Sequence, residues 1–147
     1  MLTADDEAFL RRAIELATHA VEIGDGPYGS LLVDQHGNVL VEEHNTVRRD
    51  KDISAHPELK LARWAARELD PESAAGTTMY TSCQPCQMCG GAIVRSGLGR
   101  VVYALSSDQF LELVPTGGWP DVPQDGPALF DEARAPIEGY YGAGGTD

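Results

Sequence analysis

His56-Pro57-Glu58 and Pro85-Cys86-Gln87-Met88-Cys89 are the two segments on which the fold of this chain depends. Each opens an apolar pattern of helical period, over Glu58–Leu69 and over the segment around Cys86–Arg95. Proline is accepted in the first turn of a helix because its missing N–H would have no partner there. It also biases the preceding residue towards extended backbone, so His56 is expected just outside its helix. Both segments are therefore predicted to lie at helix N-termini.

The side chains of His56, Cys86 and Cys89 supply one imidazole and two thiols, a ligand set that zinc prefers. Three protein ligands leave one tetrahedral position for water, which is typical of a catalytic site, whereas a structural zinc site normally has four. The partial positive charge of a helix N-terminus lowers the pKa of a thiol, and it is the thiolate that binds metal. We therefore expect these three residues to hold Zn²⁺.

Glu58 lies two residues after His56, at the start of the same predicted helix. A carboxylate beside zinc-bound water can accept its proton and pass it to a leaving amine, so Glu58 is the predicted catalytic residue. Each feature alone has a simpler explanation. Glu58 could only compensate the helix dipole, His56 could be a surface histidine, and a C-x-x-C pair could be redox-active. Their combination favours the metal site.

The rest of the chain predicts a layered α/β domain. Helical spacing of apolar residues indicates a helix over Met1–Ile23, with Thr3 as its N-cap, Asp6 three residues on and Gly24 at its end. A hairpin and βαβ crossovers follow, from these predicted segments: strand Tyr28–Val33, turn Asp34–Asn38, strand Val39–Glu42, polar loop His44–Ser54, strand Thr77–Thr81, strand Arg100–Leu105 and helical stretch Ser107–Leu113.

A length of 147 residues fits one domain, so we expect a single domain over residues 1–147. The stretch Val114–Gly126 is rich in proline and glycine and long for a connection, which is typical of lids and binding loops. A late helix is predicted over Pro127–Ala133, with Pro127 in its first turn. A flexible tail is expected from about residue 142.

The balance of charge restricts the partners. Eleven Lys and Arg face 23 Asp and Glu, which gives a net charge of −12 and a pI near 4.6. Such a surface repels phosphate backbones and anionic lipids, so neither nucleic acid nor a membrane is expected as a partner.

Cysteine usage and the N-terminus indicate the compartment. The cysteines, Cys83, Cys86 and Cys89, cluster in one short segment, which is no disulfide framework. No apolar run approaches the roughly 20 residues of a membrane span, and the acidic N-terminus lacks the features of a secretory signal. We expect a reduced, cytoplasmic protein.

The pattern H-x-E followed by P-C-x-x-C resembles the cytidine-deaminase-like superfamily of zinc deaminases. Within it, the chain is similar to bacterial guanine deaminases, tRNA adenosine deaminases and fungal-type cytosine deaminases. The resemblance covers most of the chain, and the lead Tyr80-Thr81-Ser82-Cys83 is most similar to guanine deaminases. It rests on these segments: Gly26-Pro27-Tyr28-Gly29-Ser30, Ser54–Glu58, Met79–Cys89 and Val101-Val102-Tyr103-Ala104.

The resemblance implies a three-layer fold with a central mixed β-sheet flanked by helices. It implies that His56, Cys86 and Cys89 hold zinc and that Glu58 shuttles the proton. It also implies that the side-chain amide of Asn45 forms a hydrogen bond with the base. Cys83 would be a buried neighbour of the site and no ligand. The backbone N–H of Cys86 is expected to stabilise developing charge. A homodimer is also implied.

Three further aromatic residues are candidates for lining the pocket. Trp119 lies in the long loop, and Tyr140 and Tyr141 lie near the C-terminus. Flat rings stack on flat bases, which favours a contact with the substrate, but exposed aromatic residues also mark subunit contacts.

Two residues depart from the family pattern. Pro57 stands where the family usually has alanine, whose N–H often contacts the base, and proline has no N–H to donate. Gln84 replaces the usual glutamate before Pro-Cys and is expected to alter the surroundings of the zinc. The Phe-Asp-Asp segment of guanine deaminases also has no match.

The predicted function is zinc-dependent hydrolytic deamination of a free nucleobase or small aminated heterocycle, guanine-like or cytosine-like, with release of ammonia. One alternative is a tRNA adenosine deaminase, which would need basic residues near the site. The other is a non-catalytic zinc-containing binding protein, suggested by the departures at Pro57 and Gln84.

Overall fold

Four strands form one mixed sheet in the order β2-β1-β3-β4 in the computed structural model, which describes residues 1–146. They are β1 (Gly29–Val33), β2 (Val39–His44), β3 (Thr78–Cys83) and β4 (Arg100–Leu105). β1 pairs antiparallel with both β2 and β3, and β3 pairs parallel with β4. Because β2 and β3 both oppose β1, they run in the same direction. The predicted hairpin and the two crossovers that follow it are confirmed.

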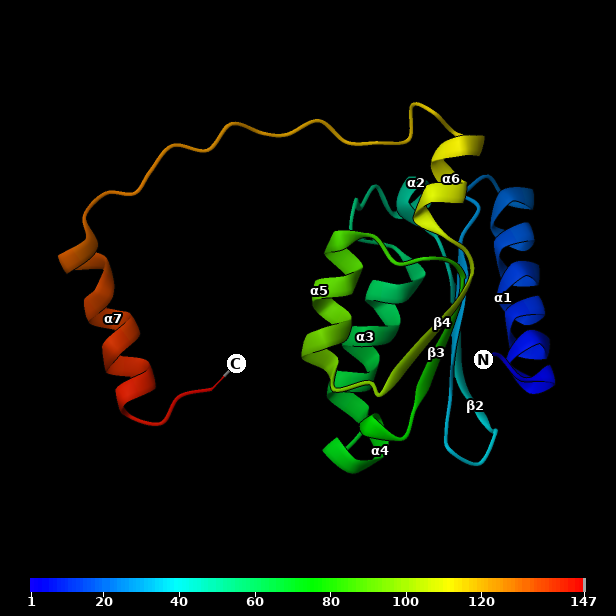
Figure 1. Cartoon of the computed structure of the whole chain (residues 1–147), viewed down its shortest axis with the longest axis horizontal. Helices are drawn as coiled ribbons and strands as arrows, with labels where there is room; N and C mark the ends of the chain where they lie inside the picture. Colours follow the sequence, from blue (N-terminus) through cyan, green and yellow to red (C-terminus); the bar gives the residue numbers. More distant parts are fainter. Residues whose placement is uncertain (147) are drawn as a thin grey trace. The chain divides into compact units, whose positions relative to one another are not determined.

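Helices cover both faces of this sheet (Figure 1). Leu31 and Val33 of β1 pack against α1 (Ala4–Glu22) in one buried cluster. Leu32, between them, faces the opposite way and joins the cluster that packs on α3 (Pro57–Glu68) and α5 (Gln87–Ser96). All five residues of β1 are buried, as expected for a strand covered on both faces. The predicted three-layer α/β architecture is therefore confirmed.

Helix α1 is fixed at its N-terminus by a capping box. The Thr3 hydroxyl accepts a hydrogen bond from the Asp6 N–H at 3.1 Å, and the Thr3 N–H donates to the Asp6 carboxylate at 2.9 Å. Gly24 follows the helix with φ of +93°, a left-handed conformation that glycine adopts without strain. The predicted cap and stop of this helix are both confirmed.

Asp6 also joins this helix to the sheet. Its side chain is 3% exposed, accepts from the Tyr80 hydroxyl at 2.7 Å and receives two bonds from the Arg100 guanidinium at 2.9 and 3.0 Å. The Arg100 hydrogen bonds are the main reason why the pKa of Asp6 lies well below its ordinary value. One buried carboxylate thus links α1 to β3 and β4.

Three short helices complete the first part of the chain: α2 (Val47–Asp50), α4 (Pro71–Ala75) and α6 (Ser107–Leu113). Only α6 was predicted. α4 begins at Pro71, because Asp70 accepts from the Ser73 N–H at 2.8 Å and caps a new turn. α2 lies in the predicted polar loop, where Asp25, distant in sequence, accepts from two of its N–H groups.

The chain divides into two compact units, Met1–Gly117 and the residues from Gly118 on, and each is described by itself. The second unit contains helix α7 (Phe130–Gly142). The prediction of a helix over Pro127–Ala133 is wrong at both ends. Leu129 has a left-handed φ of 56°, which excludes it and Pro127 from the helix, and an Arg134–Glu138 ion pair supports the later turns.

Two expectations of the sequence stay predictions. They are the single domain over residues 1–147 and the flexible tail from about residue 142, whose last residue, Asp147, lies outside the described part. None of the helices in residues 1–146 has the length and apolar character that a membrane crossing requires.

We expect Asp6→Asn to lower the free energy of unfolding at pH 7 by about 2 kcal/mol, because it weakens charge-assisted hydrogen bonds of a buried group. The folded-state pKa of Asp6 is depressed, so its stabilisation is complete above the unfolded-state pKa of about 3.9 and is lost as the pH falls below it. Urea unfolding at pH 7, 5 and 3 measures the difference. Asp5→Asn, exposed on the same turn, is the control. A loss that does not shrink in acid would contradict this assignment.

Candidate active site

Two helix N-termini meet on one face of the sheet and bring the predicted metal ligands together. His56 is the N-cap residue of α3 with φ −80° and ψ 142°, and Cys86 is the N-cap residue of α5 with φ −68° and ψ 172°. Both are extended, which Pro57 favours at His56 because it follows that residue, and Cys89 lies in the first turn of α5. The local backbone therefore presents all three side chains at the ends of two packed helices.

The distances between the ligand atoms suit a tetrahedral zinc ion. His56 Nδ1 lies 3.5 Å from Cys89 Sγ and 3.7 Å from Cys86 Sγ, and all three atoms lie within 4.8 Å of one another. Bonds of about 2.3 Å to sulfur and 2.0–2.1 Å to nitrogen at tetrahedral angles would separate S and N by about 3.5 Å. The donor set and its spacing both fit the ion.

The ionisation of the two thiols is coupled. Hydrogen bonds from Cys89 and His56 lower the pKa of Cys86 to about 3. The same bond to Cys86, together with burial and the nearby Glu58 carboxylate, raises the pKa of Cys89. The bond with Cys86 also raises the pKa of His56. Two thiols and a carboxylate crowd one small volume, an arrangement that a divalent cation would relieve.

Glu58 lies beside these ligands, at the second position of α3. It is 6% exposed, and burial is the main reason why its pKa is raised. Ser30 Oγ and Thr81 Oγ1 lie within hydrogen-bond distance of Oε1, at 3.1 and 3.2 Å, and the carboxylate also contacts the Cys89 thiol. A buried carboxylate with a raised pKa is suited to accept and release a proton.

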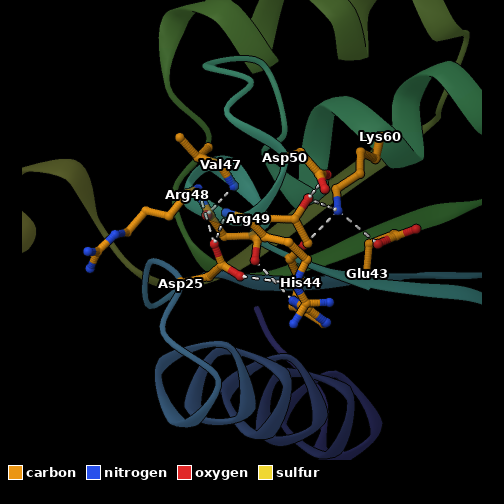
Figure 2. A network of polar contacts seen from close by, with 10 residues as sticks. Asp25, Glu43, His44, Val47, Arg48, Arg49, Asp50 and Lys60 are labelled. Carbon is orange, nitrogen blue, oxygen red and sulfur yellow. Dashed lines mark hydrogen bonds and ion pairs between the residues drawn. The ribbon is translucent and has the colours of Figure 1, made fainter.

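The segment that carries Asn45 is held in place by a network of polar contacts (Figure 2). Lys60 of α3 donates from Nζ to Glu43 Oε2 at 3.1 Å, to the His44 carbonyl at 2.8 Å and to Thr46 Oγ1 at 3.0 Å. Asp25 accepts from the N–H groups of Arg48 and Arg49 in α2, the helix that follows this segment. Because Glu58 and Lys60 lie on the same helix, the Asn45 segment is anchored to the element that carries the Glu58 carboxylate.

Asn45 itself is 4% exposed and has a fixed amide orientation. Its Oδ1 accepts from the Val47 N–H at 3.0 Å, and its own N–H donates to the Tyr28 carbonyl at 3.0 Å. Thr46, next in sequence, donates its N–H to the carbonyl of Ala55, the residue before His56. Within residues 1–146 the bonds to the Asn45 side chain use Oδ1, which leaves the Nδ2 amide as its free donor.

A family model for the cytidine and deoxycytidylate deaminase zinc-binding region matches residues 3–105, which include both metal-binding segments. The chain belongs to this family. It is therefore an enzyme, a zinc-dependent deaminase, and His56, Cys86 and Cys89 are the group in residues 1–146 that could hold the metal.

Known deaminases share most of this chain. A "probable cytosine deaminase" of Schizosaccharomyces pombe is 31% identical, over 97% of this chain and 96% of its own length. A tRNA-specific adenosine deaminase of Haemophilus influenzae is 36% identical over 69% of this chain, and the match spans only 58% of that enzyme. The crystal structure of guanine deaminase from Bacillus subtilis matches with a TM-score of 0.75 and 28% identity, over 96% of this chain and 95% of that one.

Three residues of this deaminase remain to be located: the third cysteine, Cys83, and the two departures from the family pattern, Gln84 and Pro57. Cys83 is half-buried rather than fully buried, and it is not in the ligand group. Gln84 Oε1 accepts from the Ser107 N–H at 2.9 Å, so this side chain holds the start of α6. Pro57 is buried in the first turn of α3.

Several residues around the site of the deaminase were not predicted from the sequence. Ser30 and Thr81 contact Glu58, and their only signal was their position in strands that carry family motifs. Burial is the main reason why the pKa of Tyr28 is raised. The nearby Cys83 and Cys86 thiols and the Glu58 carboxylate raise it further. Its ring centroid is 6.3 Å from that of Phe110 on α6. Trp119, Tyr140 and Tyr141 belong to the second unit, so their contact with a substrate stays a prediction.

We expect Cys86→Ser to reduce bound zinc to well below one equivalent, because a serine hydroxyl does not ionise at neutral pH to replace the thiolate. Cys83→Ser, three residues earlier, should retain one equivalent. Metal analysis after dialysis, together with a colorimetric zinc-release assay, measures both variants. Equal zinc in the two variants would remove Cys86 from the ligand set.

Proposed function

We propose that this deaminase acts on a free nucleobase or a small aminated heterocycle of guanine-like or cytosine-like shape. The observation that carries the proposal is the buried Glu58 carboxylate beside the His56, Cys86 and Cys89 ligand group. Two relatives that cover nearly the whole chain are named a probable cytosine deaminase and a guanine deaminase, and both names refer to free bases.

The reaction replaces an amine on a ring carbon by oxygen from water. His56, Cys86 and Cys89 would hold zinc, which when bound supplies a Lewis acid that activates water at neutral pH. Glu58 takes the proton from the attacking water and delivers it to the ring amine, so the C–N bond breaks and ammonia leaves. The raised pKa of Glu58 favours this double role, since a carboxylate must accept the proton before it can donate it.

The remaining predicted contacts belong to the same proposal. Asn45 presents its Nδ2 donor to an acceptor on the base. The backbone N–H of Cys86, at the start of α5, stabilises developing negative charge. Trp119 and Tyr140 close the pocket by stacking, and the enzyme is a cytoplasmic homodimer. Pro57 has no N–H to offer, so the base is recognised with one backbone donor fewer than in relatives with alanine there.

Ammonia release from a panel of free bases, their nucleosides and aminated triazines tests the substrate class. We expect turnover of at least one free base or triazine, with kcat/KM above that of any nucleoside. Silence across the panel with one equivalent of zinc bound would overturn the proposal.

Glu58→Gln separates catalysis from folding. It keeps the side chain's shape and removes its ability to carry a proton, so kcat should fall roughly 10²- to 10⁴-fold while zinc content is unchanged. Glu68→Gln, at the far end of the same helix and exposed, is the control. Full activity in Glu58→Gln would show that another group moves the proton.

Asn45→Asp tests the base contact. The substitution keeps an oxygen for the Val47 N–H and removes the Nδ2 donor, so kcat/KM should fall roughly 10-fold or more, since an acceptor on the bound base loses its partner. Asn45→Ala is neutral and has no side-chain donor, which separates the lost donor from the added charge. Steady-state kinetics on the preferred substrate measures both, and an unchanged kcat/KM in both variants would exclude Asn45.

One observation supports editing of a tRNA adenosine as the second candidate. Six of the eleven basic residues lie between positions 48 and 67, in a chain whose net charge is −12. They are Arg48, Arg49, Lys51, Lys60, Arg63 and Arg67. Binding of tRNA that weakens steeply with added salt, with deamination of tRNA but of no free base, would favour this function. Family membership and Glu58 together argue against the non-catalytic alternative.

A further inference from the structure

Two buried hydroxyls approach the catalytic carboxylate from the sheet. Ser30 Oγ and Thr81 Oγ1 both lie within hydrogen-bond distance of Glu58 Oε1, at 3.1 and 3.2 Å, and 2.7 Å from each other. Neither residue has any exposed surface. One oxygen of Glu58 is thus enclosed by two hydroxyl groups.

The sheet register brings these hydroxyls together. Ser30 of β1 and Thr81 of β3 are direct antiparallel partners. Leu32 and Met79, two residues away along the same strands, pack in the cluster shared with α3 and α5. Because side chains two apart share a face, Ser30 and Thr81 also face these helices. They therefore lie beneath the N-terminus of α3, which carries Glu58.

The available hydrogens support one bond to Oε1. Ser30 can donate to Glu58 while Thr81 donates to Ser30 or to the Cys83 carbonyl, which is 3.1 Å away. Alternatively, Ser30 donates to Thr81 and Thr81 donates to Glu58. In both arrangements Oε1 accepts one hydroxyl hydrogen and each hydroxyl has a partner. Buried hydroxyls cost free energy unless they are hydrogen-bonded, and here Glu58 is the shared acceptor.

We propose that Ser30 and Thr81 are positioning residues for proton transfer. They hold Oε1 and fix the plane of the carboxylate, so that Oε2 takes the proton from water and delivers it to the departing nitrogen. The carboxylate ends the cycle in its starting form. This inference rests on the proposed function, because it requires Glu58 to carry the proton.

The hydroxyl-deleting variants Ser30→Ala and Thr81→Val test the proposal. We expect kcat to fall roughly 10- to 100-fold in each, with KM and bound zinc unchanged, because a misplaced catalytic group slows the chemical step without weakening substrate binding. Thr81→Ser restores the hydroxyl and should recover most of kcat. The double variant should lose less than the product of the two single losses, since both hydroxyls serve one oxygen.

Thr77→Val is the matched control. Thr77 is also buried, immediately before β3, but its hydroxyl donates to the Ser73 carbonyl, so kcat should be unchanged. Thermal unfolding and zinc content identify a variant that fails to fold, in which case Ser30→Cys replaces Ser30→Ala. Normal kcat in Ser30→Ala and Thr81→Val, with Glu58→Gln inactive, would overturn this inference alone. Activity in Glu58→Gln would instead overturn the role of Glu58 in the proposed function.

Discussion

The convergence of two helix N-termini on one face of the sheet is the constraint on which the site depends. α3 and α5 both pack on the face that carries Leu32 and Met79, so their first residues, His56 and Cys86, come within ligand distance of each other. Helix N-termini also favour thiolates over thiols. The packing of the apolar core therefore determines where a metal can bind. It also places the two thiols at a helix N-terminus, where the thiolate form is favoured.

Much of this arrangement could be predicted because the signals were local. Pro57 favours extended backbone at His56 and is accepted in the first turn of its helix, and the turn at Asp34–Asn38 marked the end of the strand that precedes it. The group of His56, Cys86 and Cys89, which could hold a metal, followed from residue chemistry and from the family resemblance. These are properties of a few consecutive residues, and they hold in almost any tertiary context.

The contacts that could not be predicted depend on residues far apart in sequence. Ser30 and Thr81 meet only because of the register of β1 on β3, and α2 forms in a polar loop because Asp25 accepts its N–H groups. The unexpected α4 did have a local signal, because Asp70 before Pro71 is the pattern of an N-cap residue followed by proline in the first turn. The start of α7 was misplaced because Leu129 adopts a left-handed conformation that no pattern in its neighbourhood required.

The bond from Gln84 to the first turn of α6 has a consequence for how this enzyme can change. Gln84 lies two residues before Cys86, yet its side chain anchors the short helix that bears Phe110. The Gln84 side chain and the Gln84 N–H, which donates to the Leu105 carbonyl at 2.8 Å, thus attach α6 and the ring paired with Tyr28 to the segment that carries Cys86. Replacements within residues 107–113 can therefore change the surroundings of the Tyr28 ring while Cys86 and Cys89 keep their backbone, so the two parts of this region are free to change by separate mutations.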